Sequence, residues 1–509
     1  MSASSPKVLV IRNGQFLHGT GPEARLVTQD LIAEDGVIVR IGLNAADGMK
    51  PSSSVEIVDG ADQLVMPGFI NAHYHSHDVL GKGTMEEEPL EWWALLALPP
   101  SFPPRSVEEI RIRTLLGALE CLRGGITTVQ DMVTLFPFDP AHLDAVVEAY
   151  ESIGIRAAIG PQYADKTGIS TRPFWEEVIP EELHPLVKSF AEPDPDFDLL
   201  DYLESRYFEV PASGKVTWAL APTAPEACSD DMMRRTVALS EKYDLPIFTH
   251  IYESKSMALE ARINYAEHDG SLITWMGTLG MLGPRVNLAH SVWLADEEIQ
   301  ILAETKTKVV FNLLSNLKLK SGIPPIEAVQ RLGISYALGC DNPSCSDSQN
   351  MFQAMKLTAT LNAVTHPDPL PEQAYSVLEA ATQGGARALG LDESLGKLEV
   401  GYRADCFLID LHDPSWLPMN SAVRQLVYSE SGRGVTTVVV DGEVVIRDGK
   451  STKIDEAELR DQLAEVMPGY LNDFGKARER VSGLRPYLLE AHQRVWAQDI
   501  GMNRLFSGS

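Results

Sequence analysis

The stretch that decides the fold is VMPGFINAHYH, residues 65–75, in which an apolar run leads directly into His73 and His75. The apolar part of this run is typical of a buried strand. Seven further strand-like runs follow it, separated by amphipathic helical segments, and they end at residues 132, 160, 222, 252, 294, 314 and 341. Eight alternating strand–helix units predict an α/β fold of the (β/α)8 TIM-barrel type.

The two ends of the chain have a different pattern, in which short apolar runs are separated by Asn-Gly and Asp-Gly turns. This pattern is typical of β-hairpins. Because it occurs at both ends, we expect the two ends to form one small β-domain. The predicted domains are the first part of this β-domain at 1–65, a barrel at 66–395 with an insertion over its mouth near 165–214, the second part of the β-domain at 396–450, and a helical tail at 451–509.

The composition excludes several classes of partner. The 509 residues carry a formal net charge of −28, from 71 acidic and 43 basic residues. Such a surface repels phosphate backbones and anionic lipid, so we expect no nucleic acid and no membrane as partner. The five cysteines are scattered and form no CxxC pair, which argues for a reduced compartment. We expect a cytoplasmic homo-oligomer, a dimer or larger, that acts on a small molecule.

Histidines and one aspartate stand where the predicted strands end: His73, His75, His250, His290 and Asp341. The carboxyl ends of barrel strands meet at one face, and alternate residues of a strand point to the same side. His73, His75, His250 and Asp341 therefore predict a nitrogen–oxygen site for one divalent ion. Zn²⁺ fits this site best, Fe²⁺ and Mn²⁺ also fit, and one position stays open for water. Each histidine alone is more often structural, so the prediction rests on the combination.

Several motifs resemble those of a known family. PGFINAHYH (67–75) resembles the first-strand PGxxxxHxH signature of the amidohydrolase superfamily, and THIYE (249–253) resembles the HxxE motif of its cytosine-deaminase-like and triazine-hydrolase (ATZ/TRZ) branch. LAHSVWL, NLLSNLKLKSGIPPI and GCDNPSCSDSQNMF resemble the motifs of the sixth to eighth strands, and GYRADCFLID with VVVDGEVV resembles the C-terminal β-domain. The resemblance spans nearly the whole chain. It implies a mononuclear metal site and a composite β-sandwich.

This resemblance, together with the chemistry of the side chains, suggests three catalytic residues. The metal would lower the pKa of a bound water from about 16 to near 7. Asp341 could accept the proton of that water, and His290 could orient the water or polarise the substrate. Glu253, three residues after His250, is the candidate proton shuttle to a ring nitrogen or a leaving amine. The alternative for Glu253 is a solvated helix-capping carboxylate.

Three further residues are candidate substrate contacts: His77, Trp92 and Thr223. His77 could instead hydrogen-bond within a loop. Trp92, with its neighbour Trp93, could wall an aromatic pocket or pack in the core. Branch members that deaminate adenosine-type thioethers usually carry a histidine at the position of Thr223, so its absence argues against nucleosides as substrates.

We therefore expect a hydrolase of a non-peptide C–N bond that releases ammonia from an aminated N-heterocycle. The alternative within enzymes is hydrolysis of an amide, a urea, a carbamate, or a chloro- or alkylamino-triazine-like compound. A non-catalytic barrel scaffold is a further alternative, but such a protein would have lost metal ligands that this sequence retains. The sequence does not identify the substrate.

Overall fold

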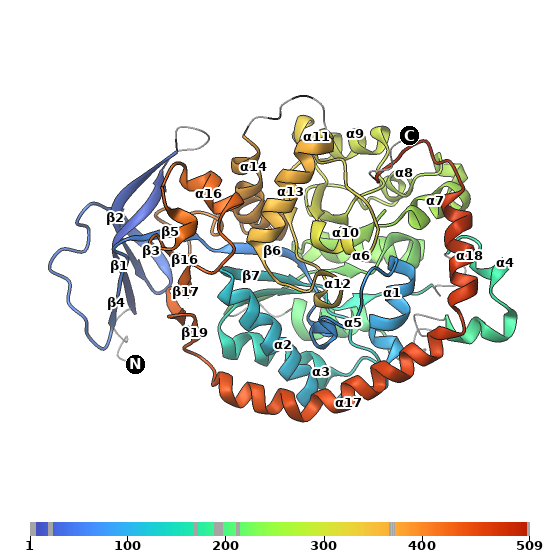
Figure 1. Ribbon diagram of the computed structural model, residues 1–509, viewed down its shortest axis with the longest axis horizontal. Helices are drawn as coiled ribbons and strands as arrows, with labels where there is room; N and C mark the ends of the chain where they lie inside the picture. Colours follow the sequence, from blue (N-terminus) through green and yellow to red (C-terminus); the bar gives the residue numbers. More distant parts are fainter. Residues whose placement is uncertain are drawn as a thin grey trace.

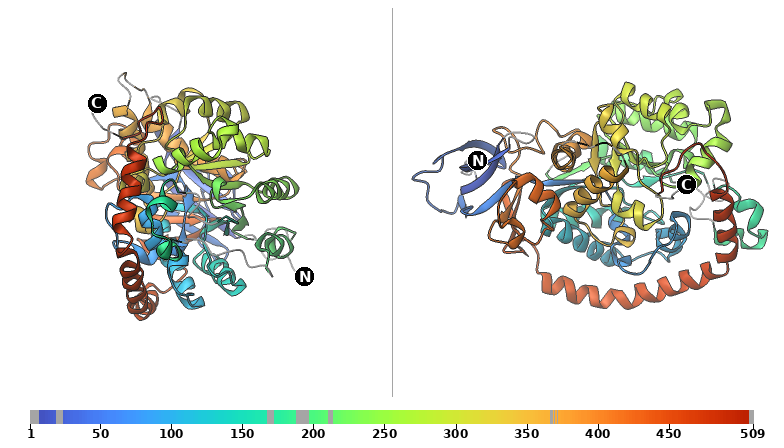
Figure 2. Two further views of the ribbon diagram at one scale, coloured as in Figure 1. Left: turned by 90° about the vertical axis from the view of Figure 1, so that its right-hand side faces the viewer. Right: turned by 45° about the horizontal axis from the view of Figure 1, so that its top comes forward.

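The computed structural model describes residues 7–18, 24–166, 172–187, 197–209, 214–365, 368, 370 and 372–505. Short parallel strands lie at the centre of the molecule, and helices surround them (Figure 1). A separate, mainly antiparallel sheet lies at one end, and two C-terminal helices run along the outside (Figures 1 and 2).

The central strands form two four-stranded parallel sheets, ordered β10-β8-β7-β6 and β12-β13-β14-β15. All eight strands predicted for the barrel are present, which confirms that part of the prediction. Nearly all of their residues are buried, as expected for parallel strands covered on both faces. Their bounds are β6 Phe69–Tyr74, β7 Ile126–Asp131, β8 Arg156–Ile159, β10 Val216–Trp218, β12 Ile247–Ile251, β13 Val286–His290, β14 Lys308–Phe311 and β15 Tyr336–Leu338.

Isolated pairings connect these two sheets. Tyr74 pairs with Asp341, and Leu220 pairs with Ile247, both in parallel orientation. A short parallel pair, β9 Gln162–Tyr163 with β11 Ala221–Pro222, extends the third and fourth strands. The strand ends that carry His73, His250, His290 and Asp341 therefore belong to one connected set of parallel strands.

Helices follow the central strands and cover them. Ser106 begins α2 by accepting a hydrogen bond from the backbone of Glu109, and Asp139 begins α3 in the same way. Side-chain caps of this kind satisfy the free N–H groups of a first helical turn. The bounds are α2 Val107–Arg123, α3 Pro140–Ile153, α6 Asp230–Tyr243, α7 Lys255–Asn264, α8 Leu272–Thr278, α9 Asp296–Thr305, α10 Leu313–Lys318, α11 Ile326–Arg331, α12 Pro343–Ser346, α13 Met351–Thr365, α14 Gln373–Glu379 and α15 Gly385–Leu389.

Strands from both ends of the chain share one nine-stranded sheet, ordered β19-β18-β17-β16-β5-β1-β2-β3, with β4 beside β1. The antiparallel pairing of β5 with β16 joins the two ends. A short helix, α16 Ala422–Tyr428, precedes β17. The strands are β1 Val8–His18, β2 Arg25–Glu34, β3 Val37–Gly42, β4 Val55–Asp59, β5 Gln63–Pro67, β16 Cys406–Asp410, β17 Val435–Val440, β18 Glu443–Arg447 and β19 Lys450–Ser451.

The remaining helices come from three parts of the chain: α1 Leu90–Ala97, α4 Trp175–Val178 with α5 Leu199–Leu203, and α17 Glu456–Ser482 with α18 Arg485–Trp496. Helix α17 runs along one side of the molecule and contacts α1 and α2 (Figure 2). Helix α18 then turns over α4 and α7. Within the described ranges, we find no helix with an apolar stretch long enough to cross a bilayer.

Candidate metal centre and active site

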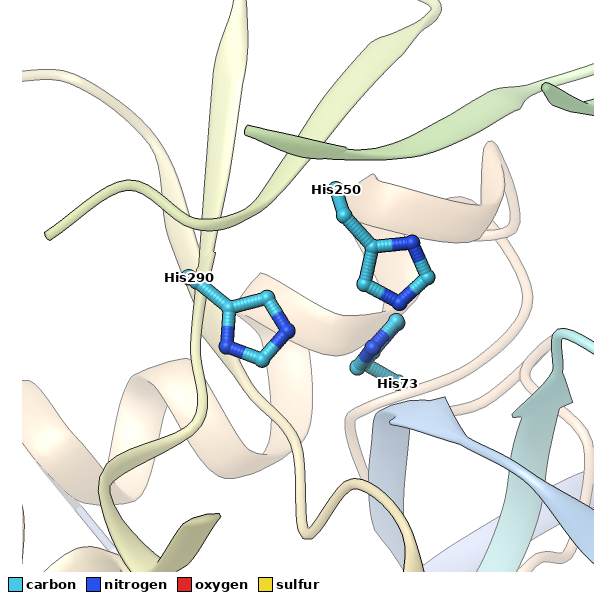
Figure 3. Close-up of side chains that lie close together, drawn as sticks. All are labelled: His73, His250 and His290. Atoms are coloured by element: carbon cyan, nitrogen blue, oxygen red, sulfur yellow. The ribbon is translucent and has the colours of Figure 1, made fainter. Parts of the chain in front are cut away.

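Five polar residues at the predicted strand ends lie close together in the structure. His73 and His75 come from the end of β6, His250 from β12, His290 is the last residue of β13, and Asp341 follows β15. Figure 3 shows the rings of His73, His250 and His290 pointing toward one another. The side chains of His73, His75, His290 and Asp341 are almost completely buried, and His250 is partly exposed.

The distances between four of these side chains are those of a metal ligand set. His75 Nε2 lies 3.2 Å from His73 Nε2 and 3.3 Å from His250 Nε2. Asp341 Oδ1 lies 3.4 Å from His73 Nε2 and 3.1 Å from His75 Nε2. A tetrahedral zinc with ligands at about 2.0–2.1 Å keeps them about 3.3–3.4 Å apart. His73, His75 and Asp341 therefore have the mutual spacing that such an ion requires, and His250 has it relative to His75.

Backbone carbonyls fix the orientation of two of the imidazoles. The Nδ1 of His75 lies 2.6 Å from Met132 O, and the Nδ1 of His250 lies 2.6 Å from Thr223 O. A carbonyl oxygen only accepts, so each Nδ1 carries the hydrogen and each Nε2 presents a lone pair. These lone pairs face each other at 3.3 Å, an arrangement that a cation between them would stabilise. The residues present thus fit a divalent metal.

The electrostatics favour the metal-binding protonation state at three of the four residues. At His75 burial lowers the pKa, but the contact with Asp341 outweighs it and the pKa is raised. Burial lowers the pKa of His73 to about 4. Burial, together with the neighbouring His73 and His75, lowers the pKa of His250 well below its usual value. Burial alone would raise the pKa of Asp341, but the nearby histidines outweigh it and hold that pKa well below its usual value. Neutral imidazoles and an ionised carboxylate are the forms that coordinate a cation.

Glu253 and His290 form the opposite side of the cluster. Glu253 Oε2 lies 3.4 Å from His290 Nε2, which is 3.7 Å from Asp341 Oδ2. The Nδ1 of His290 donates to Asn316 Oδ1 at 2.8 Å, so its Nε2 faces the two carboxylates. Burial, followed by the charges of Asp341 and Glu91, raises the pKa of Glu253 well above its usual value. A raised pKa favours the protonated form, from which a carboxyl group can act as a general acid.

This cluster forms one wall of an open cavity, whose empty space including open solvent is about 990 Å³. Its other walls are largely apolar, which suits a flat ring. They contain Leu90, Trp93, Leu95, Trp175 and Met257. The described part of the predicted insertion contributes Lys166, Arg172 and Trp175 to this cavity.

The three candidate substrate contacts differ in position. His77 and Thr223 line the cavity, but the Nδ1 of His77 also accepts a hydrogen bond from the backbone of Thr134 at 3.2 Å. Among the described residues that line the cavity is Trp93 rather than Trp92. Trp92 instead lies against helix α18, beside Arg485 and His492. The packing alternative for Trp92 therefore describes its environment better than substrate contact.

Other cavity residues were not singled out from the sequence. Gln162 donates to Met132 O at 2.8 Å and accepts from Thr223 Oγ1 at 3.3 Å, so it braces the carbonyl that holds His75. Glu226 and Arg172 also line the cavity. Glu226 could have been predicted as a cavity residue, because it is a charged residue close to a strand end, three residues after Thr223. Arg172 could not have been predicted in this way, because its partners Glu226 and Glu260 are far away in the sequence.

The sequence of residues 64–445 matches the model of the Amidohydrolase family. The chain belongs to this family. It is 32% identical to a 5-methylthioadenosine/S-adenosylhomocysteine deaminase of Pyrococcus furiosus, over 90% of this chain and 100% of the relative. The family is that of metal-dependent hydrolases, and the resemblance of the strand-end motifs is thereby confirmed.

Solved structures of the same fold contain zinc. An adenosine deaminase from Xanthomonas campestris with bound zinc superposes with a TM-score of 0.75 at 26% identity, covering 93% of this chain and 98% of that one. An atrazine chlorohydrolase from Arthrobacter aurescens complexed with zinc gives a TM-score of 0.74 at 24% identity, covering 90% and 100%. The second similarity concerns the fold alone.

Proposed function

We propose that this amidohydrolase is a zinc-dependent deaminase of an aminated N-heterocycle. The observation that carries this proposal is the buried Glu253, whose pKa is raised well above its usual value beside His290 and Asp341. An amino group leaves poorly as the amide anion and readily as ammonia once its nitrogen is protonated, so a deaminase needs an acid at this position. The names of the Pyrococcus and Xanthomonas relatives support the same reaction.

His73, His75, His250 and Asp341 would hold a single ion, for which zinc is our proposal and Fe²⁺ or Mn²⁺ the alternatives. Supporting this assignment are the ligand spacings of 3.1–3.4 Å and the tautomers set by two backbone carbonyls. When bound, the ion lowers the pKa of water toward about 7 and so supplies a nucleophile at neutral pH.

The protein's own side chains would move the protons. Asp341 accepts a proton from the attacking water, and the water oxygen bonds to the ring carbon that bears the amino group. Glu253 gives its proton to the ring nitrogen, takes one back from the hydroxyl on the attacked carbon and gives that one to the amine, so that the C–N bond breaks and ammonia leaves. The proton held by Asp341 then passes to Glu253 and restores the starting state. His290, held by Asn316, orients the attacking water. The products are the oxo-heterocycle and ammonia, which balances the reaction.

The apolar walls formed by Trp93, Trp175 and Leu95 would hold the ring. Deaminases of thioether nucleosides in this branch usually carry a histidine at the position of Thr223. Here that position offers a hydroxyl, which already donates a hydrogen bond to Gln162. We therefore expect 5-methylthioadenosine and S-adenosylhomocysteine to be poorer substrates than the best free heterocycle, although they are the named substrates of the Pyrococcus relative.

A screen of aminated pyrimidines, purines, pterins, triazines and ureas, measured by ammonia release, tests the proposal. Chloro- and alkylamino-triazines belong in the same screen, because the alternative reaction releases chloride or an alkylamine. Ammonia release from at least one heterocycle by the metal-loaded protein supports deamination. Release only of chloride, or no turnover of any heterocycle, would contradict it. Deamination of either thioether nucleoside at the rate of the best free heterocycle would refute the substrate preference alone.

We also propose that the two parallel sheets close into one (β/α)8 barrel and that the nine-stranded sheet is the composite β-sandwich. The parallel pairings of Tyr74 with Asp341 and Leu220 with Ile247 support the first statement. The pairing of β5 with β16 supports the second. A crystal structure with separate modules for the two ends of the chain would contradict the second.

A further inference from the structure

One carboxylate in the cavity wall has no part in the metal centre. Glu226 lies in the short turn Pro225–Ala227, directly after β11, and exposes only 2% of its surface. It lines the same cavity as Glu253 and Asp341. Its Oε1 lies 3.8 Å from Arg172 Nη1, whereas its Oε2 is a buried acceptor without a hydrogen-bond partner in the described structure. Such an acceptor is costly to bury, so a ligand that donates to it binds more tightly.

Arg172 lies between two carboxylates without bonding closely to either. Its Nη1 is 3.7 Å from Glu260 Oε2 and 3.8 Å from Glu226 Oε1, and it too is a buried group without a hydrogen bond in the described structure. The negative charges of Glu91 and Glu253 also stabilise the positive charge of this guanidinium. The only other cation lining the described cavity is Lys166. Acidic groups outnumber basic ones around Arg172, which favours a ligand with a positively polarised N–H group over an anion.

The position of Glu226 relative to the metal centre sets what it can recognise. It follows Thr223 by three residues, and the Thr223 carbonyl holds the metal-side His250. Glu226 thus stands at the same strand end as the residues that orient the metal ligands. A planar ring between the apolar walls can present one amino-bearing carbon to the metal centre and another edge to Glu226.

We propose, resting on the deaminase function above, that Glu226 is a specificity residue that accepts a hydrogen bond from a second amino group of the substrate. The preferred substrates are then aromatic heterocycles with at least two amino groups, one hydrolysed at the metal centre and one held by Glu226. Burial raises the pKa of Glu226, the positive charge of Arg172 opposes this shift, and Oε2 is left for the substrate. A site built to accept an N–H bond discriminates strongly against a substrate that lacks it.

Matched pairs of compounds test this inference, because the donor could also be a ribose hydroxyl. The compounds are adenine and 2,6-diaminopurine, the ribosides of both, and 2-amino- and 2,4-diamino-1,3,5-triazine. For the wild-type, metal-loaded enzyme, kcat/KM measured by ammonia release should be about 10- to 100-fold higher for the diamino member of a pair. Glu226→Leu removes both acceptor oxygens and should bring this ratio close to one. Glu226→Gln keeps one acceptor and should give an intermediate ratio.

Glu260→Gln is the matched control. Glu260 is also buried and faces the same guanidinium, but it is not among the described residues that line the cavity. Its substitution should leave the ratio between diamino and monoamino substrates unchanged. A ratio that changes equally in the Glu260 and Glu226 variants would show that only the state of Arg172 matters, and would overturn the inference.

The remaining outcomes separate this inference from the proposed function. Ammonia release with equal kcat/KM for both members of every pair would overturn the role of Glu226 and leave the deaminase function intact. A preference for ribosides that is lost in Glu226→Leu would identify a hydroxyl donor and also overturn it. No ammonia from any compound in the wider heterocycle screen would refute the proposed function, and the inference with it.

Discussion

Two residues of the candidate site have a backbone conformation that side chains with a Cβ atom rarely adopt. His290 has a φ of 69° and Asp341 a φ of 62°, both in the left-handed region. Such residues cost on the order of 1 kcal/mol or more, and they persist where the surrounding structure holds them. Both are the residues that end or follow a central strand. The strained turns aim the imidazole and the carboxylate back over the strand ends.

The first prediction at this scale concerns the metal. The wild type should bind about one divalent ion per chain. His73→Ala removes one ligand and Asp341→Asn removes the anionic ligand, so both variants should lose most of this metal and most of the activity. Elemental analysis of dialysed protein measures this. Glu253→Gln is the control that should keep its metal. Full metal content in both ligand variants would refute the ligand assignment.

The second prediction concerns Glu253. It exposes 4% of its surface, and α7 is capped by Ser254, so the solvated capping role is excluded. Glu253→Gln should lower kcat for ammonia release by about 10²–10⁴-fold, because the acid is lost while shape and metal remain. Steady-state kinetics with parallel metal analysis measure it. With a chloride leaving group the same change should cost much less. Normal ammonia release by a folded, metal-loaded variant would remove Glu253 from the mechanism.

The residues of the metal cluster could be predicted from the sequence because each stands at a strand end, and strand periodicity places His73 and His75 on one side. The partners that orient them could not. Met132, which fixes His75, is 57 residues away, and it contributes a backbone carbonyl that any residue type would offer. The pairing of Arg172 with Glu226 and Glu260 is hidden for the same reason, since only the folded insertion brings them together.

At the scale of elements, helix α18 is connected to the strand that carries His250. Lys255, the first residue of α7, donates from Nζ to the carbonyls of Gln498 at 2.7 Å and Trp496 at 3.3 Å. These carbonyls lie at the C-terminal end of α18, where a positive charge is favourable. The ammonium also lies 4.9 Å from the Trp496 ring. Two residues before Lys255 is Glu253, so the anchor of α18 adjoins the active site.

The third prediction follows from this anchor. Lys255→Met keeps the apolar stem but removes the charge and its donors, so the free energy of unfolding should fall by about 1–2 kcal/mol. Amide hydrogen exchange, measured by mass spectrometry, should be faster in α18 of the variant than in α18 of the wild type, whereas exchange in α2 should change less. Lys356→Met, at an exposed position of α13, is the control and should leave both quantities unchanged. If hydrogen exchange in α18 were the same in the Lys255 variant and the wild type, apolar packing alone would hold α18 in place.

The elements themselves were largely predictable because local signals agreed with the fold. The Asp139 cap, Pro140 and the left-handed Gly154 mark the ends of α3 in the sequence and in the structure. The helix α18 anchor was not predictable, since it depends on a lysine and carbonyls 241 and 243 residues apart. Trp92 and Trp93 were indistinguishable in sequence. Only the rotation of α1 decides that Trp93 faces the cavity and Trp92 faces α18.

At the scale of the whole molecule, a buried ion-pair cluster joins the central strands to the nine-stranded sheet. Arg156, on β8, donates from Nε to Asp405 Oδ2 at 3.0 Å and from Nη2 to Asp405 Oδ1 at 3.2 Å. Its Nη2 also reaches Asp441 Oδ1 at 3.3 Å. Asp405 directly precedes β16 and Asp441 directly follows β17. The alternation of apolar runs at both chain ends predicted a shared β-unit, but no local pattern predicted this link.

The last prediction tests whether this cluster couples the two parts. Arg156 and Asp405 are almost completely buried, so Arg156→Met would leave a carboxylate buried without its partner, at a cost of about 3–5 kcal/mol in the free energy of unfolding. Chemical denaturation of the metal-loaded protein, followed by tryptophan fluorescence, measures this loss. Because the penalty arises from the unpaired charge, Arg156→Met combined with Asp405→Asn should recover part of it.

Arg403 provides the matched control. It pairs with the same Asp441, but its side chain is about one-third exposed. Exposed ion pairs contribute about 0–1 kcal/mol, so Arg403→Met should change the unfolding curve little. If Arg156→Met were as stable as Arg403→Met, the buried cluster would not couple the parts. The contact between the central strands and the nine-stranded sheet would then be held by apolar packing, in which Gly125, just before β7, meets the ring of Phe407.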